Sequence, residues 1–317
     1  MRVSRRIVLS TLASPIVAYA QTRPVTVLVG FPAGGVADII CRIVTEELGR
    51  QAGQTIIVEN RGGAGGTLAA AAAARAQPDG QTLLFVTSGH AGNAALFNQL
   101  PYDGVKGFAS IGGVAQSPVV VLVPQASRFR SLAEIVAEAR ANPGKLNFAA
   151  AAGGATLPAL GAAVFRSQLG LDITAVNYRG TAPALAGLLA GETDFAFDIV
   201  AGAAGLVRGD QLRALAVGSA KRIEVLPAVP TIAETVLPGY EVTGWFGLLA
   251  PAGLAPAMVA HWDGLLRVAL RAETVKRKLL ELGADPMPLT SPDFAALLAR
   301  ETNRWTGVIR SLGLRAE

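Results

Sequence analysis

Short β-branched runs alternate with amphipathic stretches along most of the chain. The first run, 25–30, ends in Pro32-Ala33-Gly34-Gly35, and apolar residues then recur three and four positions apart from Ile39 to Leu48. Runs at 82–87 and 147–151 also open into turns of small residues that precede helical patterns. This succession predicts parallel strands joined by crossover helices, which is an α/β fold.

The same patterns predict the remaining elements. Further strands are expected at 55–58, 119–123, 174–178, 195–199, 212–219 and 242–249. Helices are expected at 68–76, 131–141, 159–169, 182–190, 257–270, 273–282 and 292–312. Ser131 precedes one of these helices, and Glu134 follows three residues later, which is the spacing of a capping box.

Two stretches of similar design, about 23–122 and 123–220, each contain a strand-to-helix turn rich in small residues. The turns are Phe31–Asp38 and Ala150–Thr156. In open parallel sheets, ligands bind beyond the carboxyl ends of the strands, where helix N-termini present free amides. Two such turns that face each other across a cleft predict an anion site contacted from both sides.

The first twenty residues have the features of an export signal. Arg2, Arg5 and Arg6 precede an apolar stretch at 7–18, and Ala18-Tyr19-Ala20 fits the small-residue rule for cleavage. The segment resembles a twin-arginine signal, and the general secretory route fits it equally well; a frayed amphipathic N-terminus is the alternative. We therefore expect residues 1–20 to be removed and the mature protein to work in the periplasm.

Composition narrows the function classes. Of the 317 residues, 51% are hydrophobic and 16% are charged, which excludes an intrinsically disordered chain. Without the three signal arginines, 25 basic residues face 23 acidic ones, and no basic stripe with interleaved aromatics remains for a nucleic acid. Cys41 is the single cysteine, and His90 and His261 are far apart, so we expect no disulfide and no metal. The chain has no G-x-G-x-x-G, P-loop or G-x-S-x-G motif, so we expect no cofactor and no hydrolase elbow.

Several residues are candidates for the site, and each also has a structural interpretation. The Gly34-Gly35 amides lie near the positive end of a helix and can bind an anion, or they form a plain tight turn. Asp38 either caps its helix or joins a ligand-bound water network. Asp198 ends a strand and is either a structural carboxylate or a cleft residue, and Arg179 is either a ligand cation or solvated. His90 follows a strand and can be posed as a base, although a ligand-bonding or solvated histidine is the plainer interpretation.

The order of these motifs resembles the Bug (TctC-like) family, the substrate-binding receptors of tripartite tricarboxylate transporters. The resemblance starts in Phe31–Asp38 and runs through nearly the whole mature chain. Further matching segments are Val58–Arg61, Pro78–Gly80, Leu100–Asp103, Leu212–Val217, Pro230–Glu234, Pro238–Glu241 and Trp245–Gly247. The resemblance implies a two-lobed periplasmic binding protein of the type II-like, Venus-flytrap kind, each lobe a mostly parallel sheet flanked by helices. It also implies an organic acid held by backbone amides of both lobes, partly through water, and docking on integral-membrane transporter subunits.

The expected lobes are 21–122 with about 222–317, and about 123–221. The expected ligand-binding residues are Phe31, Ala33, Gly34, Gly35, Asp38, Thr87, Ser88, His90, Ala151, Gly153, Gly154, Thr156, Tyr178, Gly180 and Asp198. We expect a monomer without catalytic activity; the alternatives are an exported hydrolase or isomerase that uses His90, Asp198 or Asp38, and a receptor for signalling.

The chain departs from the family pattern where hydroxyl residues are usual. Val36-Ala37 follow the first Gly-Gly, the second-lobe turn reads Ala150–Pro158 with few hydroxyls, and Asn177 replaces a usual proline. Backbone donors survive these changes, but most side-chain hydroxyl donors do not. We therefore expect a carboxylate ligand with an apolar body rather than a hydroxyl-rich acid such as citrate.

Overall fold

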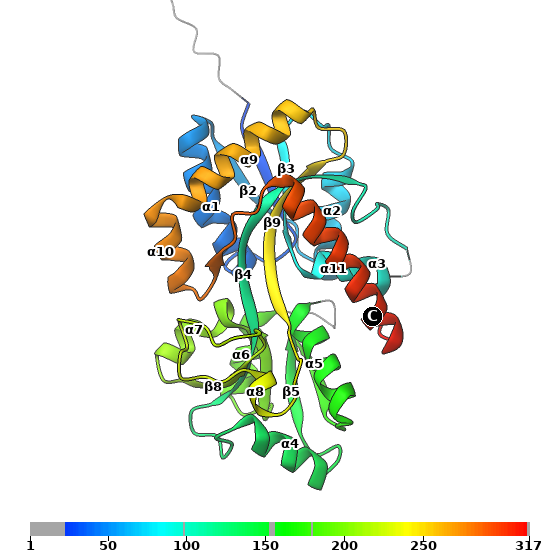
Figure 1. Cartoon of the computed structure of the whole chain (residues 1–317), viewed down its shortest axis with the longest axis vertical. Helices are drawn as coiled ribbons and strands as arrows, with labels where there is room; N and C mark the ends of the chain where they lie inside the picture. The colour runs from blue at the N-terminus through cyan, green and yellow to red at the C-terminus, as the bar shows by residue number, and fades with distance from the viewer. Residues whose placement is uncertain (1–22, 98, 152–155, 179, 316–317) are drawn as a thin grey trace, which may run out of the picture.

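The chain folds into two lobes joined by two long strands (Figure 1). The computed structural model describes residues 23–97, 99–151, 156–178 and 180–315. The upper lobe in Figure 1 contains β1 (Val25–Val29), α1 (Val36–Ala52), β2 (Ile56–Asn60), η1 (Ala64–Gly66), α2 (Thr67–Ala74), β3 (Thr82–Thr87) and α3 (Gly89–Leu96). The C-terminal elements α9 (Pro256–Arg271), α10 (Glu273–Glu281), β10 (Asp285–Pro286) and α11 (Ser291–Ser311) return to that lobe.

The lower lobe has the same alternation of strands and helices. It contains α4 (Leu132–Ala141), β5 (Asn147–Ala151), α5 (Leu157–Leu169), β6 (Thr174–Tyr178), α6 (Thr181–Leu189), β7 (Phe195–Ile199), α7 (Val200–Arg208), β8 (Leu212–Val217) and α8 (Ile232–Thr235). Strands β5, β6 and β7 agree with the sequence prediction, whereas α7 was not predicted. Helix α7 follows β7 directly, and Gly202 and Gly205 weaken its helical pattern.

The strand order is β2-β1-β3-β9-β4-β7-β5-β6, with β8 and β10 also paired to β4. Pairing is parallel within β2-β1-β3 and within β7-β5-β6, as the sequence predicts. Strands β4 (Phe108–Pro124) and β9 (Thr243–Pro251) pair antiparallel with their neighbours, so the sheets are mixed where the lobes join.

Strand β4 belongs to both lobes. Residues 108–118 pair with β9, whereas residues 119–124 pair with β7 and β8. The sequence predicted only the second part, because two register shifts and two glycines interrupt the alternation in the first. A Cβ at Gly112 or Gly113 would lie 2.8 Å from Leu289 O or 2.7 Å from Met287 O, so the glycines permit close packing of the C-terminal segment.

Three chain segments meet at Val119, where β4 passes from one sheet to the other. The Val119 amide donates to Val242 O (3.1 Å), and the Gly218 and Val242 amides donate to Val119 O (2.7 Å) and Gly218 O (2.8 Å). A Cβ at Gly218 would collide with the Val119 side chain and lie 2.9 Å from Val242 O. A glycine is therefore required where the connections between the lobes lie against each other. The expected lobe boundaries near residues 122 and 222 stay predictions.

The helix-capping signals are partly as predicted. The Glu134 amide donates to Ser131 Oγ (3.3 Å), but the Glu134 carboxylate accepts from Arg130 N rather than from Ser131. A reciprocal capping box is formed instead by Thr231 and Glu234 at α8. No helix in the described part of the chain is long and apolar enough to cross a bilayer.

Candidate functional site

One cavity of about 250 Å³ is lined by residues from both lobes. From the upper lobe come the loop and first helical residues at 31–37, together with Thr87 and Phe246. From the lower lobe come residues 156–158, 180–183, Asp198 and Ile199. The cavity therefore lies beyond the carboxyl ends of β1, β3 and β7.

Four helices begin at this cavity. Helices α1, α5 and α6 start with residues that line it, and Ile199 is the N-cap of α7. Within the described ranges, the amides of Val36, Ala37, Leu157, Thr181 and Ala182 have no hydrogen-bond acceptor. Helix N-termini carry partial positive charge, so these free donors and dipoles together favour an anion.

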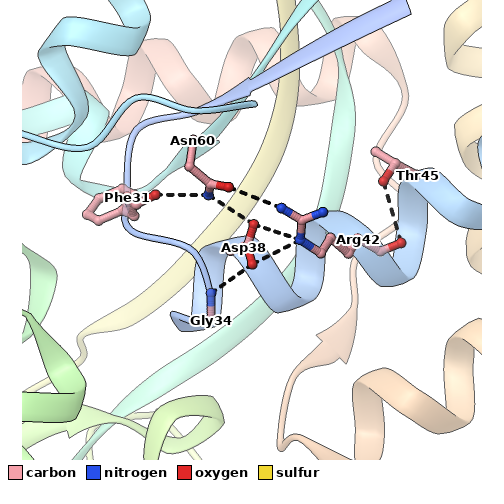
Figure 2. Close-up of polar contacts among 6 residues, drawn as sticks. All are labelled: Phe31, Gly34, Asp38, Arg42, Thr45 and Asn60. Atoms are coloured by element: carbon pink, nitrogen blue, oxygen red, sulfur yellow. Dashed lines mark hydrogen bonds and ion pairs between the residues drawn. The ribbon is translucent and has the colours of Figure 1, made fainter. Parts of the chain in front are cut away.

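The loop that precedes α1 is held by the buried carboxylate of Asp38 (Figure 2). Asp38 Oδ2 accepts from the Gly34 amide (2.9 Å), and Asp38 Oδ1 accepts from Asn60 Nδ2 (2.9 Å). Asn60 Nδ2 also donates to Phe31 O (3.0 Å), and Arg42 Nε donates to the carboxylate (2.9 Å). Asp38 thus holds Gly34 directly and Phe31 through Asn60 of β2, and the first turn of α1 presents the next amides to the cavity.

The amides that the sequence suggested as anion donors, those of Gly34 and Gly35, are occupied by other acceptors in the structure. The Gly34 amide is taken by Asp38, and the Gly35 amide donates to Pro32 O (3.2 Å). Gly34 has φ of +77°, a left-handed backbone conformation that is unfavourable for residues with a Cβ atom. Gly34 and Gly35 line the cavity and shape the turn, while the free amides belong to Val36 and Ala37.

Asp38 itself does not line the cavity. Burial raises its pKa, but hydrogen bonds from Arg42, Gly34 and Asn60 outweigh that effect and leave the pKa below its usual value. The side chain is 4% exposed, whereas that of Arg42 is 50% exposed. Asp38 is therefore an ionised positioning residue, and the base role considered for it has no geometric support.

Among the described residues that line the cavity, Asp198 is the one with an ionisable side chain. The residue is 1% exposed, and its Oδ1 accepts from the Ile199 amide (2.7 Å) and Thr181 Oγ1 (3.3 Å). Burial raises the pKa of Asp198 to about 7. A Cβ at Gly202 would lie 3.0 Å from Thr181 Cγ2, 3.2 Å from Asp198 Oδ1 and 3.3 Å from Val36 Cγ2. Helices α1, α6 and α7 thus converge closely on this carboxyl.

His90 lies in a different part of the upper lobe. Its ring stacks on Tyr102 and meets the edge of Phe108, with centroid distances of 6.0 and 5.4 Å. His90 Nε2 lies 2.8 Å from Gly104 O, and burial lowers the pKa of the imidazole. His90 does not line the cavity between the lobes, and its contact with the ligand stays a prediction.

The structure brings together eight of the predicted site residues at the cavity: Phe31, Ala33, Gly34, Gly35, Thr87, Thr156, Gly180 and Asp198. Ser88 is a buried residue before α3, and its amide donates to Trp245 O (2.8 Å). The Tyr178 hydroxyl donates to Glu192 Oε2 (2.8 Å), away from the cavity. Ala151 ends β5, while Gly153, Gly154 and Arg179 lie outside the described residues.

Sequence reasoning missed several lining residues. Val36, Thr181 and Ile199 are neighbours of predicted residues, and the strand-to-helix turns could have indicated them. Phe246 is brought in by the antiparallel pairing of β9 with β3, in which it lies opposite Thr87. No local pattern reveals that pairing.

The described residues contain no group of three or more His, Cys, Asp and Glu side chains that could hold a metal ion. Cys41 is fully buried in the core between α1 and the sheet, and burial raises the pKa of its thiol. The described lining residues of the cavity offer amides, threonine hydroxyls and one carboxyl.

The sequence model of the TctC family, described as "Tripartite tricarboxylate transporter family receptor", matches residues 40–314. The chain belongs to this family. A relative from Pseudomonas sp. strain P51, the UPF0065 protein in the tcbD-tcbE intergenic region, is 35% identical over 97% of this chain and 91% of its own length. The resemblance seen in the sequence motifs is thereby confirmed.

Three solved structures have the same fold. The periplasmic binding protein BugD is 28% identical, with a TM-score of 0.86 over 93% of this chain and 99% of its own. MatC from Rhodopseudomonas palustris, with bound malate, is 34% identical, with a TM-score of 0.83 over 90% and 98%. R. palustris Rpa4515, with adipate, is 31% identical, with a TM-score of 0.87 over 92% and 98%. The predicted fold class, a two-lobed α/β periplasmic binding protein, is confirmed, and the TctC family to which the chain belongs is one of transporter receptors.

Proposed function

We propose that this TctC-family protein captures a small organic carboxylate between its lobes in the periplasm and delivers it to the membrane subunits of a tripartite tricarboxylate-type transporter. The observation that carries the proposal is the convergence of four helix N-termini on one cavity between the lobes, with free amides in the described first turns of α1, α5 and α6. No lysine or arginine lines this cavity in the described part of the chain, so amides and dipoles supply its attraction for an anion. The malate and adipate bound by two relatives support the same ligand class.

The ligand that fits best has an apolar body. Most of the cavity wall is apolar, contributed by Phe31, Val36, Leu157, Pro158, Pro183, Ile199 and Phe246. The polar side chains among the described lining residues are three threonines and Asp198. Each ligand hydroxyl left without a partner on binding costs about 1–3 kcal/mol, which disfavours a hydroxyl-rich acid such as citrate.

Binding needs movement of the lobes and no chemical step. We propose a first lobe of residues 21–122 with about 222–317 and a second of about 123–221, which close about the junction at Val119 and Gly218. A ligand that contacts both lobes has higher affinity for the closed arrangement and shifts the equilibrium towards it.

An exported hydrolase or isomerase has weaker support. The candidate base His90 is packed against Tyr102 and Phe108, and Asp38 is engaged by Arg42 and Asn60. Neither side chain lines the cavity that holds Asp198, so these three residues do not form an acid–base pair.

The test is to identify and titrate the ligand. Mass spectrometry of small molecules released from protein purified without refolding is expected to show an organic acid. In calorimetry with malate, adipate, citrate, hexanoate and benzoate, the acids that bind are expected to occupy one site per chain and to be recovered unchanged, and citrate is expected not to bind most tightly. Binding of none of these anions, preference for an amine or a sugar, or conversion of the acid to a product would contradict the proposal.

A further inference from the structure

The cavity that attracts an anion also contains a carboxyl group. Asp198 is 1% exposed and lines the cavity, with Oδ1 occupied by the Ile199 amide and Thr181 Oγ1. Its second oxygen, Oδ2, has no hydrogen-bond partner within the ranges that the structure describes. Asp198 Oδ2 is therefore available for a hydrogen bond with a molecule that enters the cavity.

No described side chain neutralises this acid. From α1, Asp38 and Arg42 are bonded to each other and to Asn60 (Figure 2). From α7, Arg208 lies at the far end of the helix and donates to Glu281 O (2.7 Å). Strands β4 and β5 and helix α6 carry no ionisable side chain, and Ser117 of β4 is bonded to Gly283 O and the Ala201 amide. Arg213 of β8 donates to Phe129 O and Gln125 O, and Arg179 lies outside the described residues.

Two ionised carboxylates in one small apolar cavity repel each other. The same situation in other proteins is relieved by sharing one proton, which raises the pKa of one member of the pair. Burial already raises the pKa of Asp198 to about 7, so a neighbouring anion needs to add little to keep it protonated.

We propose that Asp198 is the specificity-determining residue of the cleft: it takes up one proton from solvent when a carboxylate binds and donates it through Oδ2 to that ligand. This inference rests on the proposed function, since it concerns the same site. No covalent bond to the ligand forms or breaks. The site thus binds an anion together with a proton, and the affinity for a carboxylate depends on pH although the ligand itself stays ionised.

The test is calorimetry of malate, adipate, hexanoate and benzoate between about pH 6 and pH 8.5, in phosphate and in Tris. These buffers differ in ionisation enthalpy, so the difference in measured heat counts the protons taken up. For the acids that bind, we expect about one proton bound per ligand at pH 8 and a Kd that rises about tenfold per pH unit above pH 7. Asp198→Asn keeps a hydrogen-bond donor in the same place and is expected to bind with no proton uptake and a flat pH profile.

The matched control is Asp172→Asn, an identical change at an exposed carboxylate that does not line the cavity. It is expected to keep the wild-type profile. A wild-type protein that binds without proton uptake, or an Asp198→Asn variant that keeps the pH slope, overturns the inference and leaves the proposed function intact. Failure of every acid to bind at any pH overturns both. The proton count of the wild type decides the matter even where Asp198→Asn fails to fold.

Discussion

Val36→Pro removes one of the amides on which carboxylate binding is expected to depend. Val36 is the first residue of α1, a position where proline is well tolerated because its missing N–H has no partner in the helix. Gly35 has φ of −77° and ψ of 166°, which is the extended conformation that a following proline requires. The substitution therefore deletes a donor while the helix and its loop are preserved.

The expected loss follows from the strength of a hydrogen bond to a charged group, about 1.5–3 kcal/mol. That range corresponds to a roughly 10- to 150-fold increase in Kd for the bound acid. The matched control is Val36→Ala, which also removes the valine side chain but keeps the amide. We expect the ratio of the two Kd values, measured by calorimetry at one pH, to report the amide alone.

Thermal unfolding of both variants shows whether the fold is preserved. Equal Kd values for Val36→Pro and Val36→Ala, within about twofold and with similar unfolding temperatures, would refute the claim that this amide contacts the ligand. Selective loss in Val36→Pro would support backbone recognition in the upper lobe.

Four further predictions concern stability. Burial raises the pKa of Asp198 from 3.8 to about 7, so the folded state binds a proton at this carboxyl more tightly than the unfolded state does. The stabilisation that this proton gives is fully present below about pH 4 and is lost as the pH rises through 7. Between pH 4 and pH 7, the unfolding free energy of the wild type should fall by roughly 4 kcal/mol relative to that of Asp198→Asn, measured by urea unfolding at each pH. The same pH dependence of the unfolding free energy in both proteins would contradict this. Gly218→Ala forces a Cβ into Val119 and should cost about 1–3 kcal/mol in urea unfolding, whereas Gly205→Ala, in an open helical position, should be neutral or stabilising; equal effects would argue against the close junction. Asp38→Ala leaves the Gly34 amide and Asn60 without their acceptor and should cost about 1–3 kcal/mol and weaken ligand binding, while Arg50→Ala on the same helix changes stability by less than about 1 kcal/mol. Gly34→Ala meets no neighbour but is strained at φ of +77°, so a loss of about 1 kcal/mol in unfolding is expected, and an unchanged midpoint would count against that conformation.

The strand-to-helix succession could be predicted because it depends on local patterns. Apolar residues such as Ile40, Val44 and Leu48 mark one buried face of α1, and the structure buries them. The first half of β4 could not be predicted, because Gly112, Gly113 and the register shifts interrupt the two-residue period. Its role as a strand is set by pairing with β9, more than 120 residues later in the chain.

The site was predictable to the extent that it consists of turns. Asp198 is the second-last residue of β7, and its place at the cavity follows from the parallel pairing of that strand with β5. The partners of Asp38 and His90 were not predictable, because Asn60 and Gly104 approach them only in the folded chain. The sequence therefore indicated which turns form the site but not which of their polar groups remain free.

A structure determined with the bound acid tests the central claim most directly. We expect a carboxylate of the ligand within hydrogen-bond distance of the Val36 or Ala37 amide, with the Thr181 or Ala182 amide and Asp198 contacting the molecule from the other lobe. A ligand bound outside this cavity, or an uncharged or cationic molecule held within it, would contradict the account.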